Sequence, residues 1–429
     1  MKEIIEVSLF LIFVKLFLFW LWLWQLKEYH IGRFLAHFKE GQAVKKIISG
    51  FWRLKYPKFT KKIIVISLAG LILAILMFWK GFYLPAFILI ILVPLAFQAP
   101  TVIWRKSFLK KARLKREGFK NLLVIGITGS YGKTSTKEFL YDILSQKFRV
   151  LATKEHQNSE VGIARCILNE LKPEHEIFIV EMGAYSKGGI KLLCDMVKPK
   201  IGVLTGINEQ HMATFGSQEN IIKAKYELIE SLPEDGMAFF TAKNKYCVEL
   251  YDKTLRRGSG QAFLYGQDAA FFGQENILGA QAVARELGII AENSSPPKLL
   301  SIKEGANGLN IIDSTYSANP TGVIAHLDYL TLRFPQGKKV LVMPCLIELG
   351  SASRDVHRRI GQKISEVCDL AIITTKDRFK EIKETAGDKA VFMENPKEIF
   401  EKIKSICKEG DNVLLESRIP KLLIELLHV

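Results

Sequence analysis

The sequence has no closely spaced pair of cysteines. No C-x-x-C motif and no cluster of histidines occurs anywhere in the chain. Zinc sites and redox-active dithiols need such spacing, because their ligands must converge on one point. We therefore expect reduced, buried thiols in a cytosolic body at all six cysteines: Cys166, Cys194, Cys247, Cys345, Cys368 and Cys407.

Most of the chain, residues 121–429, carries no net positive charge. The protein has 429 residues and a net charge of +16, but residues 1–120 hold 21 Lys and Arg against 5 Asp and Glu. Residues 121–429 are therefore neutral overall, and a neutral body has no general attraction to a phosphate backbone. Nucleic acid is not an expected partner. The length and the 48% hydrophobic content are sufficient for two or three packed domains.

Charge is nearly absent from three long stretches near the N-terminus. Residues 63–79 and 81–104 carry no Asp, Glu, Lys or Arg, and residues 7–24 carry only Lys15. Each stretch has about the length of a helix that crosses a bilayer. A buried helix of a soluble core is disfavoured, because two uncharged runs follow each other with Trp and Tyr near their ends. We expect residues 1–104 to form a transmembrane anchor of about three helices.

Basic segments flank these stretches. Residues 25–62 hold ten Lys and Arg against Glu28 and Glu40, and residues 105–120 hold eight against Glu117. Because basic loops stay on the cytoplasmic side, both segments should be cytoplasmic, with the N-terminus and Lys80 outside. We therefore predict a multi-pass protein of the cell membrane with cytoplasmic catalytic domains. Residues 105–120 form the predicted basic juxtamembrane linker, and membrane lipid is an expected partner.

A glycine-rich loop follows the first strand after this linker. The apolar run at residues 121–127 continues into TGSYGKTS at residues 128–135 and then into a helical stretch at residues 136–144. Backbone N–H groups, the helix N-terminus and the lysine of such a loop bind phosphate, and its Thr hydroxyl can hold Mg²⁺. Kinases, GTPases and ATP-driven motors share this loop. The predicted nucleotide contacts are Gly129, Ser130, Gly132, Lys133, Thr134 and Ser135.

Five ordered blocks in residues 121–429 resemble the Mur ligases. The blocks are GITGSYGKTSTKE (126–138), FIVEMG (178–183), INEQHMATFGS (207–217) followed by AKYE (224–227), DSTYSANP (313–320), and ELG (348–350) followed by His357. The resemblance implies an α/β protein with a central P-loop ATP-binding domain at residues 121–304 and a Rossmann-like C-terminal domain at residues 305–429, behind the transmembrane helices. It implies a ligase that uses ATP and Mg²⁺ to activate a carboxylate as an acyl phosphate, which an amine then attacks.

The resemblance also implies roles for single residues. The catalytic candidates are Lys133, Lys225 and His211. The implied magnesium ligands are Thr134, Glu181, His211 and Lys225, the last as a carbamate. Beyond the loop, the implied nucleotide contacts are Asn276, Asp313 and His357. The implied substrate contacts are Asn158, Tyr316 and Asn319, although packing explains Tyr316 equally well.

The membrane region stands where soluble members of the family have a UDP-binding domain. We therefore expect the acceptor to be a muramoyl-peptide or lipid-linked envelope precursor, reached at the membrane surface. The expected amine is an amino acid or dipeptide, D-alanyl-D-alanine above all. A membrane ligase for another envelope polymer, such as a polyglutamate capsule, and an inactive membrane scaffold remain alternatives.

Overall fold

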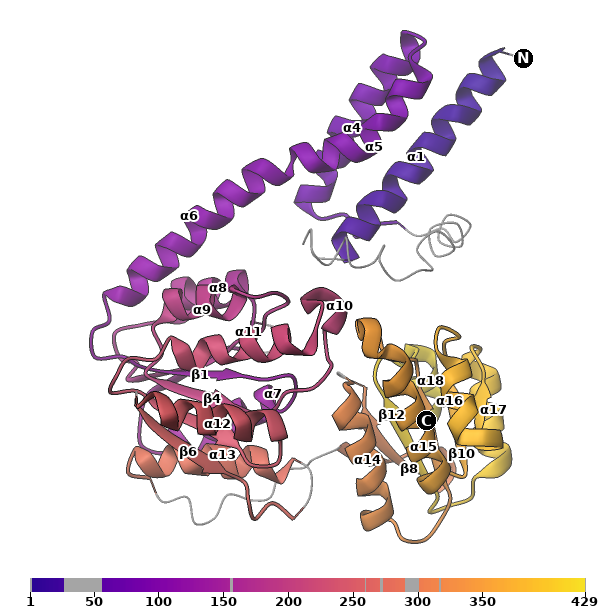
Figure 1. Cartoon of the computed structure of the whole chain (residues 1–429). Coiled ribbons are helices and arrows are strands. Elements are labelled where there is room, and N and C mark those ends of the chain that lie inside the picture. The colour runs from indigo at the N-terminus through magenta and orange to yellow at the C-terminus, as the bar shows by residue number, and fades with distance from the viewer. Residues whose placement is uncertain are drawn as a thin grey trace. The chain divides into compact units, whose positions relative to one another are not determined.

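The structure, a computed structural model, describes residues 2–26, 56–154, 157–258, 260–270, 273–289, 301–315 and 318–428 (Figure 1). The chain divides into two compact units, Met1–Lys111 and Ala112–Val429. The described part of the first unit is mainly helical. The second contains two separate α/β domains, each built on a six-stranded sheet.

The helical unit contains α1 (Lys2–Leu26), α4 (Lys61–Trp79), α5 (Tyr83–Ala96) and the first part of α6 (Gln98–Glu117). Gly81 has φ +76°, which allows the tight turn between α4 and α5. The ring of Phe17 on α1 packs against Gly70 on α4, where a side chain would collide with it. Three helical stretches, Glu3–Gln25, Lys62–Trp79 and Tyr83–Glu117, are long and apolar enough to cross a membrane. The segment predicted as a linker is not a separate element, because α6 continues through it to Glu117.

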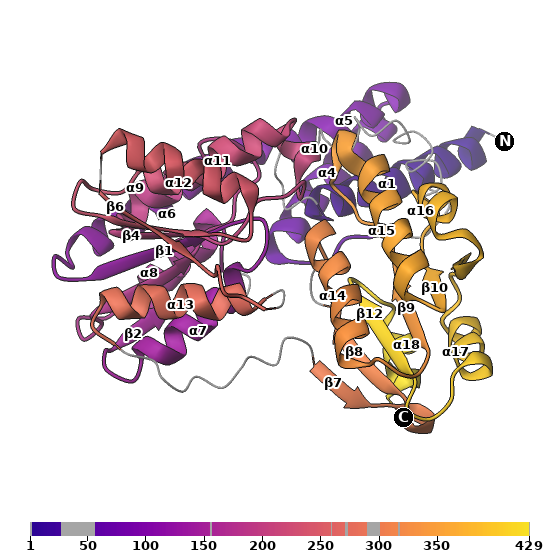
Figure 2. The same cartoon turned by 60° about the horizontal axis from the view of Figure 1, so that its bottom comes forward.

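The first α/β domain has a fully parallel sheet with the order β2-β3-β1-β4-β5-β6. Helices α7 and α13 cover one face of this sheet, and α11 and α12 cover the other (Figure 2). The strands are β1 (Leu123–Thr128), β2 (Val150–Ala152), β3 (Ile177–Glu181), β4 (Ile201–Leu204), β5 (Met237–Thr241) and β6 (Gln261–Tyr265). The helices are α7 (Lys133–Leu144), α8 (Glu160–Glu170), α9 (Gly189–Val197), α10 (Met212–Phe215), α11 (Gln218–Glu230), α12 (Lys245–Arg257) and α13 (Gln274–Glu286).

The strand order reverses at β1, which pairs with β3 on one side and with β4 on the other. In open parallel sheets, ligands bind in the crevice outside the carboxyl ends of the strands at such a reversal. The loops after Thr128, Glu181 and Leu204 therefore meet at the place where the fold most readily accommodates a site.

The second α/β domain has the strand order β11-β10-β9-β12-β8-β7, in which only the β7–β8 pair is antiparallel. Its strands are β7 (Ser301–Glu304), β8 (Asn310–Ser314), β9 (Lys339–Met343), β10 (Leu370–Ile373), β11 (Ala390–Phe392) and β12 (Asn412–Glu416). Its helices are α14 (Pro320–Arg333), α15 (Ser353–Val367), α16 (Phe379–Ala386), α17 (Pro396–Ile406) and α18 (Lys421–Leu427). The two sheets confirm the predicted α/β class.

Candidate active site

The glycine loop between β1 and α7 is packed too tightly for side chains at two positions. Gly132 has φ +76°, and a Cβ there would collide with Oδ1 of Asn276. A Cβ on Gly129 would collide with the hydroxyl of Thr205, which itself donates a hydrogen bond to the carbonyl of Tyr131. The loop is therefore held in one conformation by α13 and by the end of β4. A fixed curl of this kind lets backbone N–H groups surround a phosphate.

A buried carboxylate lies beside this loop at the end of β3. Glu181 accepts one hydrogen bond at Oε2 from the Thr134 hydroxyl and one at Oε1 from the amide of Asn158, each 3.0 Å long. The ammonium of Lys137 lies 3.5 Å from Oε2. Burial opposes ionisation of Glu181, but the charge of Lys133 and the hydrogen bond from Asn158 hold the pKa of this carboxyl below its usual value. Glu181 is thus an anion although only 5% of it is exposed.

Two further lysines of the site are withdrawn from solvent, Lys133 in part and Lys225 almost completely. Lys133 Nζ donates a 2.9 Å hydrogen bond to the carbonyl of Gly129, and burial lowers its pKa. Lys225, on α11, is 3% exposed, and burial, followed by the charge of Lys133, lowers its pKa from 10.5 to about 7. Within the described part of the chain, Lys225 has no hydrogen bond or ion pair. A lysine that is partly neutral near pH 7 is a nucleophile that can take up CO₂.

His211 lies in the left-handed region (φ +64°) directly before α10. Its Nδ1 is 2.7 Å from Oε2 of Glu348, and the ring of Tyr185 meets it edge-on with centroids 4.9 Å apart. Burial lowers the pKa of His211, Glu348 opposes this, and the charges of Lys225 and Lys133 lower it further. Both lysines are therefore close enough for their charges to act on His211.

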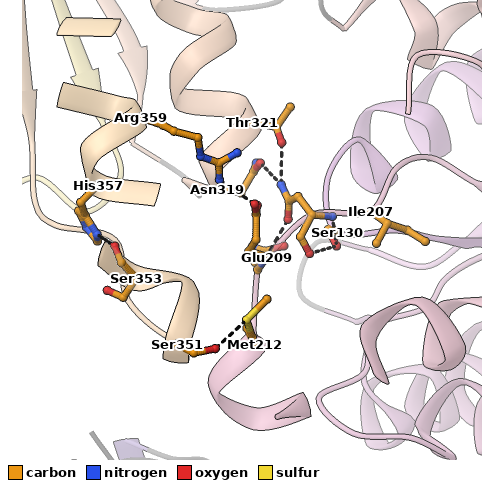
Figure 3. Close-up of polar contacts among 12 residues, drawn as sticks. Ser130, Ile207, Glu209, Met212, Asn319, Thr321, Ser351, Ser353, His357 and Arg359 are labelled. Carbon is orange, nitrogen blue, oxygen red and sulfur yellow. Dashed lines mark hydrogen bonds and ion pairs between the residues drawn. The ribbon is translucent and has the colours of Figure 1, made fainter. Parts of the chain in front are cut away.

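The predicted substrate residue Asn319 is connected to the phosphate loop through Asn208. Asn319 caps α14, since its Oδ1 accepts from the N–H of Gly322 at 3.0 Å, and the same oxygen accepts from Nδ2 of Asn208 at 2.8 Å. The N–H of Asn208 in turn donates to the Ser130 hydroxyl at 3.2 Å (Figure 3). Asn208 also donates to the hydroxyl of Thr321 at 3.0 Å. This chain of bonds ties the phosphate loop to the second α/β domain.

His357 does not have the surroundings of a nucleotide ligand. It is fully buried, its Nδ1 lies 2.6 Å from the carbonyl of Ser353, and its Nε2 accepts from the N–H of Leu346 at 3.0 Å. Figure 3 shows its ring pointing toward Ser353. Both ring nitrogens are occupied by backbone groups, which argues against the predicted nucleotide contact. His357 instead holds the segment before α15.

The remaining predicted residues lie as follows. Asp313 caps its own loop, because its Oδ1 accepts from the N–H and the hydroxyl of Thr315 at 3.0 and 2.7 Å. Ser135 is exposed on the first turn of α7. Asn276 lies against Gly132, and its Oδ1 accepts from the Thr136 hydroxyl at 3.3 Å. Tyr316 lies outside the described residues.

The donor set suits a hard cation. Magnesium prefers oxygen ligands, and the Glu181 carboxylate and Thr134 hydroxyl already lie in contact. Among the described residues, no three His, Cys, Asp and Glu side chains come together as a ready-made metal site. A carbamate on Lys225 would add the anionic oxygens that the protein side chains alone do not supply.

Sequence reasoning missed Lys137, Asn208 and Glu348. Lys137 stands one helical turn after Lys133 on α7, so the i, i+4 spacing was a usable signal for it. Asn208 and Glu348 act through residues more than a hundred positions away, at Asn319 and His211. Both residues lie within the blocks quoted above, but no local pattern could have indicated these contacts.

Comparison with known proteins agrees with this geometry. Residues 127–288 match the Mur ligase middle domain, and residues 300–418 match the Mur ligase glutamate ligase domain. The UDP-N-acetylmuramoyl-tripeptide–D-alanyl-D-alanine ligase of Bacillus subtilis is 28% identical over 72% of this chain and 75% of its own length. The enzyme of the same name from Synechocystis is 28% identical over 63% of this chain and 62% of its own length.

A solved structure, the MurF ligase of Thermotoga maritima in complex with ADP, superposes with a TM-score of 0.64 and 26% identity. The superposition covers 75% of this chain and 83% of that one. The two matched domains together span most of the second compact unit, and the phosphate loop, Glu181 and Lys225 lie within the first of them. The chain therefore belongs to the Mur ligases, ATP-dependent enzymes that form carbon–nitrogen bonds with Mg²⁺ as the usual metal.

Proposed function

We propose that this chain joins D-alanyl-D-alanine to the free carboxylate of a muramoyl tripeptide at the cytoplasmic face of a membrane. The observation that carries the proposal is the contact of Glu181 with Thr134 and Asn158 beside the phosphate loop. The relatives with which the chain shares 28% identity are named for this reaction. They support the choice of substrates, although the chain spans only 62% to 75% of their length.

The residues of the site suit the activation of a carboxylate. Backbone N–H groups of the glycine loop would bind the triphosphate, and Lys133 and Lys137 would offset its charge. Glu181 and Thr134 would hold Mg²⁺, with His211 and the carbamate of Lys225 completing the set. The bound metal ion would neutralise charge on the phosphate oxygens.

The reaction then has two steps. An oxygen of the substrate carboxylate attacks the terminal phosphorus of ATP, ADP leaves, and an acyl phosphate remains on the substrate. The amine of the dipeptide attacks the acyl carbon, the C–N bond forms, inorganic phosphate leaves, and the nitrogen gives up a proton. Water would destroy the acyl phosphate, so the bonds from Asn208 to Asn319 and Thr321 matter because they hold the second domain against the loop.

The membrane location is part of the proposal. Three stretches of the helical unit have the length and composition of membrane spans, and apolar side chains such as Ile72, Leu84 and Ile91 are exposed on them. Basic residues are concentrated in residues 105–120, as expected for a segment at the cytoplasmic surface. A membrane anchor suits an acceptor that is itself carried by a lipid, so we propose a lipid-linked muramoyl peptide ahead of a UDP-linked one.

The test is phosphate release by the full chain in detergent or nanodiscs. Release should require ATP, the muramoyl tripeptide and D-alanyl-D-alanine together, and mass spectrometry should find the amide product. Lys133→Ala should abolish release, whereas Lys147→Ala, at an exposed lysine just after α7, should not. Equal or better turnover of the UDP-linked acceptor would refute the lipid-linked choice. No release with either acceptor from folded protein would refute the proposed reaction.

A further inference from the structure

Glu348 contacts His211 from the other α/β domain. Glu348 follows β9 in the second domain, and its Oε2 lies 2.7 Å from Nδ1 of His211, which precedes α10 in the first domain. The backbone takes part as well, because the carbonyl of Glu348 accepts a 3.0 Å hydrogen bond from the N–H of Ala213. The side chain and the main chain of one residue therefore hold the same short segment.

The backbone on both sides is shaped for this contact. Glu348 and His211 both have φ +64°, a left-handed conformation that is uncommon for residues with a side chain. At Gly350, which has φ +52°, a Cβ would lie 3.0 Å from the backbone nitrogen of Ala213. The two backbone segments therefore approach each other more closely than a side chain at this position would readily allow. Conformations of this kind persist only where the surroundings hold them, and they concentrate at functional sites.

The contact determines which nitrogen of His211 carries the proton. An ionised carboxylate only accepts hydrogen bonds, so in the neutral imidazole Nδ1 donates to Glu348 and Nε2 keeps its lone pair. The edge-on ring of Tyr185, with an interplanar angle of 78°, limits rotation of the imidazole from a second direction. Within the described part of the chain, no hydrogen bond is made to Nε2 of His211.

We propose that Glu348 is a positioning residue for His211, fixing the ring orientation and the tautomer in which Nε2 can bind the metal ion. The inference rests on the proposed function, because it takes His211 as a metal ligand. Carboxylate groups commonly orient metal-binding histidines in this way. Since Glu348 belongs to the second domain, docking of that domain and metal binding must favour each other by the same factor.

The inference has a specific alternative, in which Glu348 merely helps to hold the two domains together. A matched control lies at the same interface, where Arg359 Nη2 pairs with Glu209 Oε1 at 2.7 Å (Figure 3). Arg359 also lies on the second domain, and Glu209 is two residues before His211, yet this pair does not touch the imidazole. Arg359→Ala therefore weakens docking without freeing the His211 ring.

The experiment is a titration of the full chain, in detergent with ADP, using Mn²⁺ as the probe and electron paramagnetic resonance as the readout. Glu348→Ala should weaken Mn²⁺ binding about 10- to 100-fold, the usual effect of losing a partner of a metal-binding histidine. Glu348→Gln keeps an accepting oxygen and should retain most of the affinity. Arg359→Ala should stay within about twofold of the parent. The double variant His211→Ala with Glu348→Ala should bind no worse than His211→Ala alone, because the two residues act through one ligand.

The outcomes separate the inference from the proposed function. If His211→Ala loses affinity and Glu348→Ala does not, the positioning role is refuted and the proposed function stands. If Arg359→Ala loses as much as Glu348→Ala, the contact only holds the domains together. If His211→Ala binds Mn²⁺ like the parent, His211 is not a metal ligand and the inference fails, whereas the proposed function fails only if phosphate release is absent. Should circular dichroism show that Glu348→Ala is unfolded, Glu348→Asp keeps the charge, shortens the reach and should also weaken binding.

Discussion

Lys225 gives the sharpest test of the site, because its chemistry follows from its burial. Its pKa falls from 10.5 to about 7, so that about half of the amine is neutral at pH 7, against roughly one molecule in 3,000 for an ordinary lysine. Only the neutral amine combines with CO₂, and it releases one proton in doing so. Carbamate should therefore form at pH 7 to 8 and disappear as the pH falls below the lowered pKa. Forming it also replaces a buried cation beside Lys133 with an anion.

The assay is ¹³C NMR of the full chain in ¹³C-labelled bicarbonate. We expect a carbamate signal at pH 8 that is lost below about pH 6, absent in Lys225→Met and retained in Lys223→Met, which changes an exposed lysine on the same helix. Lys225→Ala should lose turnover, and small carboxylates should partly restore it. A parent protein without the signal at pH 8, or a Lys225→Ala variant with parental turnover, would refute the reasoning.

Three further results are expected. Gly132→Ala should weaken ATP binding about tenfold or more and cost about 1–3 kcal/mol of stability in thermal melts, because φ is +76° and the new Cβ meets Asn276. Gly188→Ala is the matched control, because Gly188 has φ +81° but no neighbour within 4 Å of a new Cβ. Equal ATP affinities in the two variants would contradict the proposed effect of the collision with Asn276. Lys133→Ala should leave the chain in the membrane pellet while turnover is lost, and a soluble variant would show that the loop affects insertion. Lys80→Cys should react with an impermeant maleimide in intact cells and Lys245→Cys only after permeabilisation, and the reverse pattern would overturn the predicted orientation.

Most of the fold could be predicted from apolar runs. Parallel strands buried on both faces, such as β1 and β9, are continuous hydrophobic segments, and the apolar run at residues 121–127 agrees with β1 within two residues. Strand β7 is a polar edge strand, SIKE, and β11 has only three residues, so neither forms an apolar run from which a strand could be predicted. The basic segment before β1 was predicted as a linker for its charge, yet Lys, Arg, Ala and Leu are good helix formers, and α6 runs through it.

The site residues also differ in whether local sequence is sufficient to predict them. The glycine loop and Glu181 depend on local order of strand, loop and helix, so the sequence pattern was sufficient to nominate them. Glu348 could not be paired with His211 in advance, because only the folded arrangement of two domains brings them together. The nucleotide contact of His357 stays a prediction. Its two nitrogens contact backbone groups four and eleven residues away, which residue type and spacing do not reveal.

Because α6 is one continuous helix, a change in its length also changes the face on which each later side chain lies. Each residue of an α-helix turns the chain by about 100°, so one residue added between Arg105 and Lys111 would move the helix residues that follow it, as far as Glu117, onto a different face of α6. Removing seven residues, nearly two full turns, would shorten the helix by about 10 Å and leave the remaining side chains on almost the same faces. The side chains of α6 would therefore keep their faces if the helix changed in length by about two turns, but not if it changed by a single residue.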